Sequence, residues 1–271
     1  RNPGAARMVQ PANRPRRLPH RATVVGVDFR AALLEQTRSF GELIRDADPS
    51  TPVPTCPDWT LKQLFRHVGR GNRWCTQIIA ERRTEPLDPR EVREGKPPED
   101  LDAAIDWLND GAQALIDTVE RIGPHSKVWT FVGPHIPGWW IRRRVHEQTV
   151  HRADAATALG AEFTLPADLA ADGVSEWIDL ATARYAPIAR GQTLHLHATD
   201  EGLGPTGEWT IVHDEDGVSW SHAHGKGDAA VRGRAVDLLL AITRRRTAAE
   251  AGLEILGDAA VWDGWLAGTP F

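Results

Sequence analysis

The chain has 271 residues, more than one compact core usually holds, so its length predicts two domains. The apolar and charged fractions, 41% and 25%, are ordinary for globular proteins, and the net charge of −5 argues against a nucleic-acid-binding surface over the body of the chain. No apolar run is long enough to span a bilayer, so we expect neither a membrane nor a nucleic-acid partner.

Residues 1–27 are rich in Arg and Pro and contain no hydrophobic stretch, so we expect them to form a disordered extension. Residues 28–160 contain four amphipathic helical patterns, at residues 29–47, 60–80, 99–122 and 139–160. The second pattern begins at Thr60, because Thr60 and Gln63 have the spacing of a capping box. Four such helices with long connections predict a four-helix bundle, and bundle cores commonly bind metals between facing helices.

Residues 161–271 show a different pattern, which predicts a small α+β domain. Apolar residues alternate at residues 193–198, 208–213 and 217–222, which predicts three strands, the last two joined by a hairpin turn. We expect further strands at residues 229–233 and 253–256, and helices at residues 172–185, 236–244 and 259–266.

The fourth bundle helix carries a row of polar residues. Glu147 and His151 are four residues apart, so in a helix their side chains lie one turn apart on the same face. A carboxylate oxygen and an imidazole nitrogen at this spacing can both reach one divalent cation. Arg144 and Asp154 extend the row at spacings of three. The alternative is a solvated face on which an acid and a histidine are neighbours by chance.

The second helix supplies a third candidate ligand. His67 lies at the edge of the apolar stripe of this helix, beside Leu64, and should point toward a crevice. The alternative is a hydrogen-bonded packing histidine. With Glu147 and His151, it would give two nitrogens and one oxygen and leave coordination positions open, as in catalytic zinc sites. The zinc-protease motif H-E-x-x-H is excluded, because Val150 stands where its second histidine would be.

The C-terminal half contains a rival metal site. His195 and His197 share one face of a predicted strand, and His213, His222 and His224 are candidates to approach them. Alternating histidines on a solvated sheet face are the commoner explanation of this pattern.

Two segments and the C-terminal run carry a family resemblance. Val53-Pro-Thr-Cys-Pro-Asp-Trp-Thr60, followed by Leu64-Phe-Arg-His67, resembles the N-terminal signature of the mycothiol-dependent maleylpyruvate isomerase family, a branch of the DinB-like bundles. Glu147-Gln-Thr-Val-His151-Arg-Ala-Asp154 is similar to the later metal motif of the same family. Asp237-Leu-Leu-Leu240 and Leu253-Glu-Ile-Leu-Gly257-Asp258 resemble the end of its sterol-carrier-like C-terminal domain.

The resemblance implies a DinB-like four-helix bundle followed by a small, sterol-carrier-like α+β domain. It also implies that His67, Glu147 and His151 bind a divalent metal, with zinc the expected ion, and that mycothiol is the thiol. A catalytic arginine of the C-terminal domain is implied at the cleft between the domains, and Arg245 aligns best with it. The family has an aromatic residue and a glycine before this arginine, whereas this chain has Thr243 and Arg244.

Thiol chemistry then suggests the function. A free thiol with a pKa of about 8.5 is mostly protonated at neutral pH, whereas a zinc-bound thiol is deprotonated. Together with this chemistry, the resemblance implies a metal-dependent mycothiol S-transferase acting on an electrophilic small molecule, because the family includes S-transferases of antibiotic biosynthesis and detoxification. Addition to a conjugated alkene, bond rotation and expulsion of the thiol would instead give cis–trans isomerisation of the maleylpyruvate type. A non-enzymatic small-molecule carrier is the alternative of another class.

The remaining expectations concern single residues. Arg245 and Asp154 are the expected catalytic residues, with Asp154 acting in acid–base chemistry or behind a metal ligand. Arg144 and Trp140 are expected to contact the thiol, although a run of three arginines such as residues 142–144 is more typical of a solvated helix end. Cys56 and Cys75 lack C-x-x-C spacing, which fits a reduced, cytoplasmic setting. We expect a monomer or a homodimer.

Overall fold

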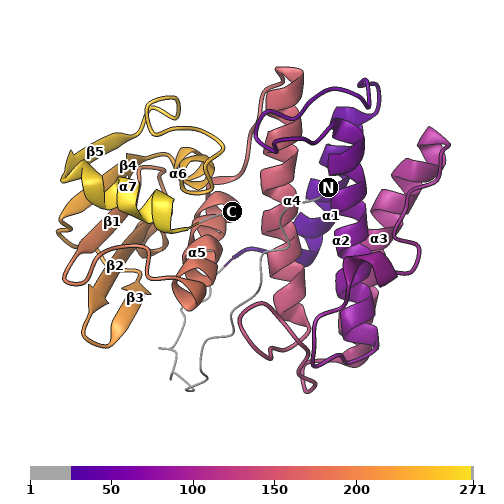
Figure 1. Cartoon of the computed structure of the whole chain (residues 1–271), viewed down its shortest axis with the longest axis horizontal. Helices are drawn as coiled ribbons and strands as arrows, with labels where there is room; N and C mark the ends of the chain where they lie inside the picture. Colours follow the sequence, from indigo (N-terminus) through magenta and orange to yellow (C-terminus); the bar gives the residue numbers. More distant parts are fainter. Residues whose placement is uncertain (1–25, 270–271) are drawn as a thin grey trace, which may run out of the picture.

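The structure of the chain is a computed structural model that describes residues 26–269. The disordered extension expected at residues 1–27 therefore falls almost wholly outside the described residues. Figure 1 shows the helical part of the chain on one side of the molecule and the sheet on the other, with α5 between the sheet and α4. Within the described part, no helix is both long and apolar enough to cross a membrane.

The first part is the predicted bundle, made of α1 (Phe29–Ile44), α2 (Leu61–Ala80), α3 (Leu101–Ile122) and α4 (Gly138–Leu159). The backbone N–H of Thr60 donates to the Gln63 side chain at 2.7 Å, as the capping-box spacing predicts. Gly160 caps the C-terminus of helix α4 and takes the left-handed conformation that glycine favours at this position. A short 3₁₀ helix, η1 (Pro89–Glu91), interrupts the charged loop between α2 and α3.

The second part has helices and strands in the order α5 (Ala167–Arg184), β1 (Thr193–Ala198), η2 (Gly204–Gly207), β2 (Glu208–Asp214), β3 (Gly217–Ser221), β4 (Ala229–Gly233), α6 (Ala235–Ile242), β5 (Glu254–Gly257) and α7 (Ala259–Gly268). The five strands form one sheet in the order β3-β2-β1-β4-β5. The pair β1 and β4 is parallel and the other pairs are antiparallel. A helical bundle followed by a small α+β domain is therefore confirmed as the fold class.

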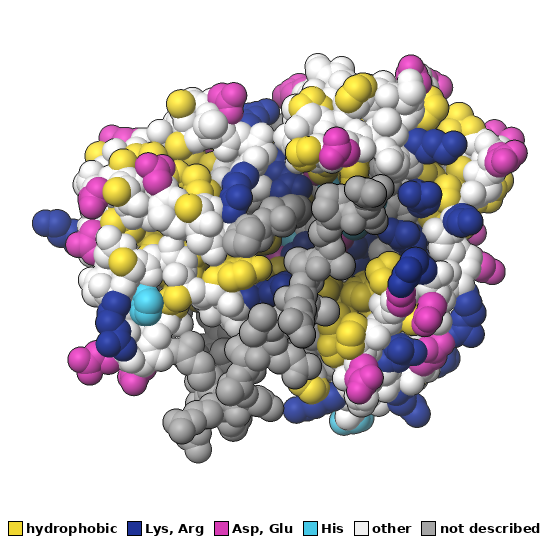
Figure 2. All heavy atoms as spheres, viewed as in Figure 1, with side chains coloured by type: hydrophobic (Ala, Val, Ile, Leu, Met, Phe, Trp, Pro, Cys, Tyr) yellow, Lys and Arg dark blue, Asp and Glu magenta, His cyan; other side chains and the backbone are white. Residues whose placement is uncertain are grey.

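The sheet uses its two faces differently. One face packs its apolar side chains with those of α5, α6 and α7 into a single core, to which the central strands contribute Leu194, Leu196, Trp209 and Ile211. Because successive residues of a strand point to opposite faces, the residues between them lie on the other face, among them His195, His197, Glu208 and Thr210. Figure 2 shows acidic and basic side chains interspersed over one face of the molecule.

Helix α5 begins earlier than the sequence indicated. We predicted a start at Asp172, but the helix begins at Ala167, directly after Pro166. Leu169 is buried, so the first turn of α5 packs into the protein instead of forming a loop. Asp172 is therefore an interior residue of the helix, where its buried carboxylate pairs with α4.

The seam between α4 and α5 is made of buried ion pairs. Arg142 Nε lies 2.8 Å from Asp172 Oδ2, and Arg143 Nη1 lies 2.6 Å from Glu176 Oε2. His146 Nε2 also lies 2.6 Å from Asp172 Oδ2. The arginine run is thus not a solvated helix end: Arg143 is buried, and the run ties the bundle to the C-terminal part.

Candidate metal centre

Helices α2 and α4 bring the three predicted metal ligands together. His67 Nε2 of α2 lies 3.0 Å from Glu147 Oε1 of α4. His151, one turn further along α4, places its ring 4.8 Å from the ring of His67, nearly perpendicular to it. One donor atom from each of the three side chains lies within 4.8 Å of the other two. The row expected from helical spacing and the histidine expected at a crevice therefore converge on one point.

Asp154 fixes the orientation of His151. Burial alone would raise the pKa of Asp154, but the His151 hydrogen bond and the Arg245 charge hold it below the ordinary value. The carboxylate is therefore ionised and accepts a hydrogen bond from His151 Nδ1 at 2.8 Å. Burial lowers the pKa of His151, although Asp154 acts in the opposite direction, so the imidazole is neutral at neutral pH. Its Nε2 then carries the lone pair that a metal ligand needs.

Asp154 is itself surrounded by donors. The Thr55 hydroxyl donates to Oδ1 at 2.6 Å, the Cys56 thiol lies 3.3 Å from Oδ2, and Arg245 Nε donates to Oδ1 at 3.0 Å. Burial raises the pKa of the Cys56 thiol to about 12, and the Asp154 charge acts in the same direction. Cys56 is therefore a thiol donor, in agreement with the absence of a basic partner in the sequence.

Two arginines hold the other ligand, Glu147. Arg144 Nη1 lies 2.7 Å from Glu147 Oε2, and Arg143 Nε lies 3.6 Å from the same oxygen. Arg144 also donates to Asn72 Oδ1 and to the Val68 carbonyl, both at 2.9 Å, and is almost fully buried. Burial alone would raise the pKa of Glu147, but Arg144, His67 and Arg143 together hold it well below the ordinary value. The carboxylate is therefore ionised and fixed in place.

The donor set fits a divalent metal. Ligands at about 2.0–2.1 Å from a tetrahedral zinc ion lie about 3.3 Å from one another, close to the 3.0 Å between His67 Nε2 and Glu147 Oε1. Two imidazoles and one carboxylate are the composition of open, catalytic zinc sites. The side chains of His67 and Glu147 retain 29% and 19% of their exposure, so the centre is accessible to a ligand from solvent.

Comparison with known proteins identifies the family. The model of the mycothiol maleylpyruvate isomerase N-terminal domain matches residues 30–156, and that of the C-terminal domain of the same isomerase matches residues 168–264. The chain belongs to the mycothiol-dependent maleylpyruvate isomerase family. The isomerase for which the family is named is an enzyme, and this chain is accordingly an enzyme.

Solved structures agree with this fold. A crystal structure of a histidine-to-alanine mutant of the mycothiol-dependent maleylpyruvate isomerase matches with a TM-score of 0.54, and a second crystal structure of that isomerase matches with 0.53. Both are 17% identical to this chain, and each match covers 79% of this chain and 86% of the other. No curated protein sequence matches.

Some of the site residues predicted from the sequence lie away from the candidate metal centre or support it from behind. Trp140 is fully buried in a cluster of aromatic rings, and its indole N–H donates to the Trp129 carbonyl at 3.0 Å. Arg144 supports Glu147 from the interior instead of facing solvent. Arg245 contacts Asp154, while Arg244 before it has a φ of 61°, the backbone conformation that the glycine of the family pattern favours.

Trp59 lies beside the candidate centre, although the sequence did not single it out as a site residue. We would interpret it from sequence alone as a hydrophobic residue ahead of the Thr60 helix cap. In the structure its ring centre lies 4.9 Å from that of His67 and 6.2 Å from that of His151, so it covers both imidazoles. The sequence feature that pointed to Trp59 was its position inside the N-terminal motif, which runs from Val53 to His67.

Proposed function

We propose that this chain is a metal-dependent enzyme that uses mycothiol to act on an electrophilic small molecule, and that its reaction is cis–trans isomerisation. The observation that carries the proposal is the convergence of His67, Glu147 and His151 on one accessible point, with Asp154 behind His151. A divalent metal bound there would lower the pKa of a thiol and so supply a thiolate nucleophile at neutral pH.

The residues of the chain supply binding and orientation. His67, Glu147 and His151 would hold the metal, with zinc the ion that this donor set favours. Asp154 holds the proton on Nδ1 of His151, so that Nε2 faces the centre. Arg144 keeps Glu147 ionised and directed toward His67. The Trp59 ring lies against the two imidazoles and limits access of water to them.

Arg245 acts in this proposal as a positioning residue. We expected from the family resemblance an arginine that contacts the substrate at the cleft. Its guanidinium instead donates to both carboxylate oxygens of Asp154, at 3.0 and 3.3 Å, and to the Thr243 carbonyl at 2.8 Å. The pairing neutralises the buried charge of Asp154 and connects the C-terminal part of the chain to the metal centre.

The comparisons support isomerisation more strongly than S-transfer. The sequence alone led us to favour transfer of the thiol to an electrophile. The family and both solved structures carry the name of an isomerase, which supports the alternative more strongly. The same nucleophile could perform either reaction, because both begin with attack of the thiolate on an electrophilic carbon.

The test is a direct assay of the purified chain with zinc, mycothiol and maleylpyruvate. Isomerisation predicts that the substrate is converted while the mycothiol concentration stays constant, because the thiol is expelled at the end of each turnover. S-transfer predicts that one mycothiol is consumed for each product formed. His67→Ala should reduce the rate to that of the uncatalysed reaction.

His67→Ala also tests the enzyme assignment itself. If this variant binds as many metal ions as the wild-type chain and keeps its affinity for mycothiol, the proposed centre is wrong. If the wild-type chain binds mycothiol but neither isomerises maleylpyruvate nor transfers the thiol to any of a panel of electrophiles, the protein is a carrier and not an enzyme. Exposed Arg66, the neighbouring residue on α2, offers a matched control, because Arg66→Ala should leave metal content and turnover unchanged.

A further inference from the structure

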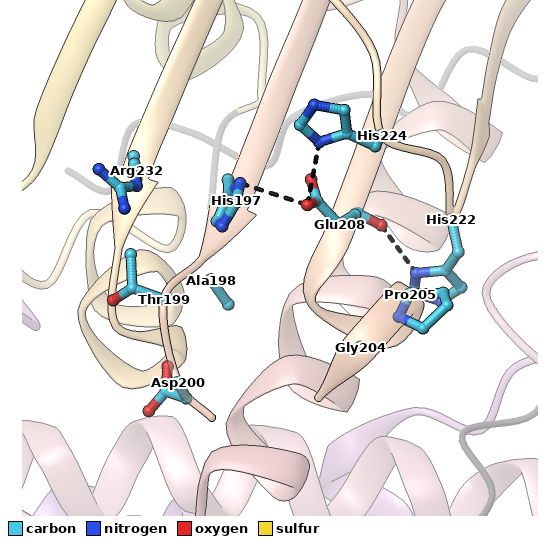
Figure 3. Close-up of a pocket in the computed structure, with 10 residues that line it drawn as sticks. All are labelled: His197, Ala198, Thr199, Asp200, Gly204, Pro205, Glu208, His222, His224 and Arg232. Atoms are coloured by element: carbon cyan, nitrogen blue, oxygen red, sulfur yellow. Dashed lines mark hydrogen bonds and ion pairs between the residues drawn. The ribbon is translucent and has the colours of Figure 1, made fainter. Parts of the chain in front are cut away.

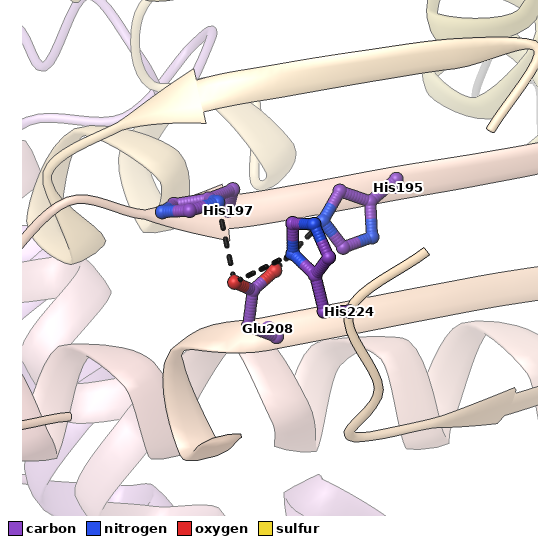
Figure 4. A group of neighbouring side chains, drawn as sticks. All are labelled: His195, His197, Glu208 and His224. Atoms are coloured by element: carbon purple, nitrogen blue, oxygen red, sulfur yellow. Dashed lines mark hydrogen bonds and ion pairs between the residues drawn. The ribbon is translucent and has the colours of Figure 1, made fainter. Parts of the chain in front are cut away.

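A second cluster of metal-ligating side chains lies on the sheet face that α5, α6 and α7 do not cover. Strands β1 and β2 pair in a register that places His195 opposite Thr210 and His197 opposite Glu208. These four side chains therefore point to the same face. His224, from the segment after β3, completes the cluster, and Figure 4 shows the three imidazoles arranged around the Glu208 carboxylate.

Glu208 is the centre of this cluster. Its Oε1 lies 3.2 Å from His197 Nδ1 and 3.1 Å from His224 Nδ1, and its Oε2 lies 2.7 Å from His195 Nε2. The three imidazole rings are nearly perpendicular to one another, with centres 5.5 to 6.3 Å apart. One donor atom from each of the four residues lies within 4.8 Å of the others.

Hydrogen bonding determines which nitrogen of His195 carries its proton. The Thr210 hydroxyl has one proton, and it donates this proton to the Ala223 carbonyl at 2.8 Å. The contact of 3.1 Å between the Thr210 hydroxyl and His195 Nδ1 must then be donated by the Nδ1–H of His195. In the neutral imidazole, Nε2 is left with a lone pair directed at Glu208.

A lone pair that faces a carboxylate oxygen is an unfavourable contact unless a proton or a metal ion lies between the two atoms. The side chain of His195 is only 4% exposed. Although His195 Nε2 and Glu208 Oε2 lie 2.7 Å apart, their geometry is not that of a hydrogen bond, and neither atom has another partner in the described part of the chain. Buried polar atoms without partners are rare and need an explanation, such as a bound ion.

We propose that His195, His197, Glu208 and His224 bind a second divalent transition-metal ion, of the zinc class. Three imidazole nitrogens and one carboxylate oxygen favour zinc over magnesium or calcium, which prefer oxygen ligands. In a tetrahedral zinc site the ligand atoms would lie about 3.3 Å apart. Donor atoms that are now up to 4.8 Å apart must therefore approach one another, and His195 Nε2 and Glu208 Oε2, now 2.7 Å apart, must separate slightly. His224 can supply this movement, because its side chain is 78% exposed.

The surroundings give an ion access to the cluster. A cavity of about 580 Å³ is lined by His197, Glu208 and His224, together with Arg232 and Asp200 nearby, as Figure 3 shows. His213 and His222, which the sequence also suggested, instead contact backbone carbonyls, of Ile188 and Glu208 respectively. Four protein ligands fill a tetrahedral shell, so this ion would be structural and would fasten the segment after β3 to the sheet.

The test is the zinc stoichiometry of the full-length chain, freed of metal and titrated with Zn²⁺ against a chelator. We expect two bound ions in the wild-type chain and one in His67→Ala. In the His67→Ala background, His224→Ala should lower the zinc affinity of the remaining site at least about tenfold. Tenfold is the lower end of the loss seen when a residue that only supports a ligand is removed, and His224 would be a ligand itself. His222→Ala, two residues away, is the matched control and should keep the ion.

The outcomes separate this site from the centre in the bundle. One ion in the wild-type chain that persists in His67→Ala supports the sheet site and counts against the bundle centre. Complete loss of zinc in His67→Ala overturns the sheet site. So does an ion that remains bound to His67→Ala when Glu208 and His224 are also replaced by alanine. Nitrogen-15 NMR of the histidine rings gives a second readout. In the metal-free chain His195 should be neutral with its proton on Nδ1, and addition of zinc should shift the resonance of its Nε2. A doubly protonated His195 that zinc leaves unchanged would also overturn the proposal.

Discussion

In the proposed metal centre, Asp154 is a buried carboxylate that would organise the site without binding the metal. It has no exposure to solvent, and the donors around it come from three parts of the chain: the loop before α2, the preceding turn of α4 and the segment after α6. Of these, His151 is the only partner that would also bind the metal. The charge of Asp154 therefore acts on the metal through the tautomer and orientation of that imidazole.

Asp154→Asn should weaken metal binding about 10–100-fold, the range found when such a supporting partner of a ligand is removed. The amide keeps the size of the side chain but loses the charge that holds the proton on His151 Nδ1. Competition with a chelator of known affinity measures the change. Asp106→Asn, at an exposed position of α3, is the control, and an equal affinity in both variants would rule out this role.

At the scale of helices, α2 approaches its two neighbours through glycines. A Cβ atom added at Gly69 would lie 2.1 Å from the Trp107 ring of α3. One added at Gly71 would lie 2.5 Å from the Arg144 guanidinium of α4. The two glycines are two residues apart on one helix, but only Gly71 faces Arg144, the residue that pairs with the proposed metal ligand Glu147.

Gly71→Ala should therefore displace Arg144 from Glu147 and weaken zinc binding, because the carboxylate loses its strongest charge partner. Zinc affinity and thermal unfolding of the metal-free protein are measured together. Gly138→Ala is a control with open space around the added methyl group.

Gly69→Ala provides the contrast. Overpacking against Trp107 should cost about 1–3 kcal/mol of unfolding free energy, but zinc affinity should stay near that of the wild-type chain. If the two alanine variants lower zinc affinity equally, the effect comes from general loosening of α2 and not from Arg144.

The seam between α4 and α5 should make stability depend on pH. Burial alone would raise the pKa of Asp172, but His146 and Arg142 lower it from 3.8 to about 2. A depressed carboxyl pKa stabilises the folded state above the unfolded pKa, and this stability is lost as the pH falls from about 4 to about 2. The shift corresponds to about 2 kcal/mol.

The stability difference between the wild-type chain and Asp172→Asn should accordingly shrink by about 2 kcal/mol between about pH 5 and pH 2. Urea unfolding at several pH values measures this difference. Asp168→Asn, an exposed position in the first turn of the same helix, should show no such trend. A difference that is independent of pH would mean that the Asp172 carboxylate titrates normally in the folded protein.

For the whole molecule, local patterns predicted more than long-range ones. The spacing of Glu147 and His151 lies within one helix, so helical periodicity placed both on one face, and the same reasoning gave the bundle and the strands. The position of Trp140 in the core, the burial of Arg144 and the contact between Trp59 and the imidazoles depend on how separate segments pack. No periodicity contains that information, so the sequence could not place these side chains.

The histidines of the sheet illustrate the same limit. Alternation placed His195 and His197 on one face, but the partner across the strand pair was unknown. Only the register of β1 with β2 brings Glu208 to them, and only the path after β3 selects His224 over His213 and His222. A strand pattern therefore predicts which side chains share a face, whereas the ligand set depends on the topology of the sheet.

The pair of Arg245 and Asp154 connects the two parts of the molecule, and its coupling can be measured. Both side chains are buried, so removing one charge leaves the other unpaired, which typically costs 3–5 kcal/mol. Arg245→Met and Asp154→Asn should each destabilise the metal-free chain, whereas the double variant should be more stable than the sum of the single effects predicts.

A coupling energy of about 0.5–3 kcal/mol is expected from unfolding of the four proteins in urea. Arg246 is an exposed neighbour of Arg245, and the effects of Arg246→Met and Asp154→Asn on the unfolding free energy should be additive. Additivity for Arg245 as well would show that the C-terminal part does not stabilise the metal centre through this contact. Coupling together with weaker zinc binding in Arg245→Met would mean that the C-terminal part helps to position a ligand in the bundle. The isolated bundle would then be expected to bind the metal less tightly than the full chain.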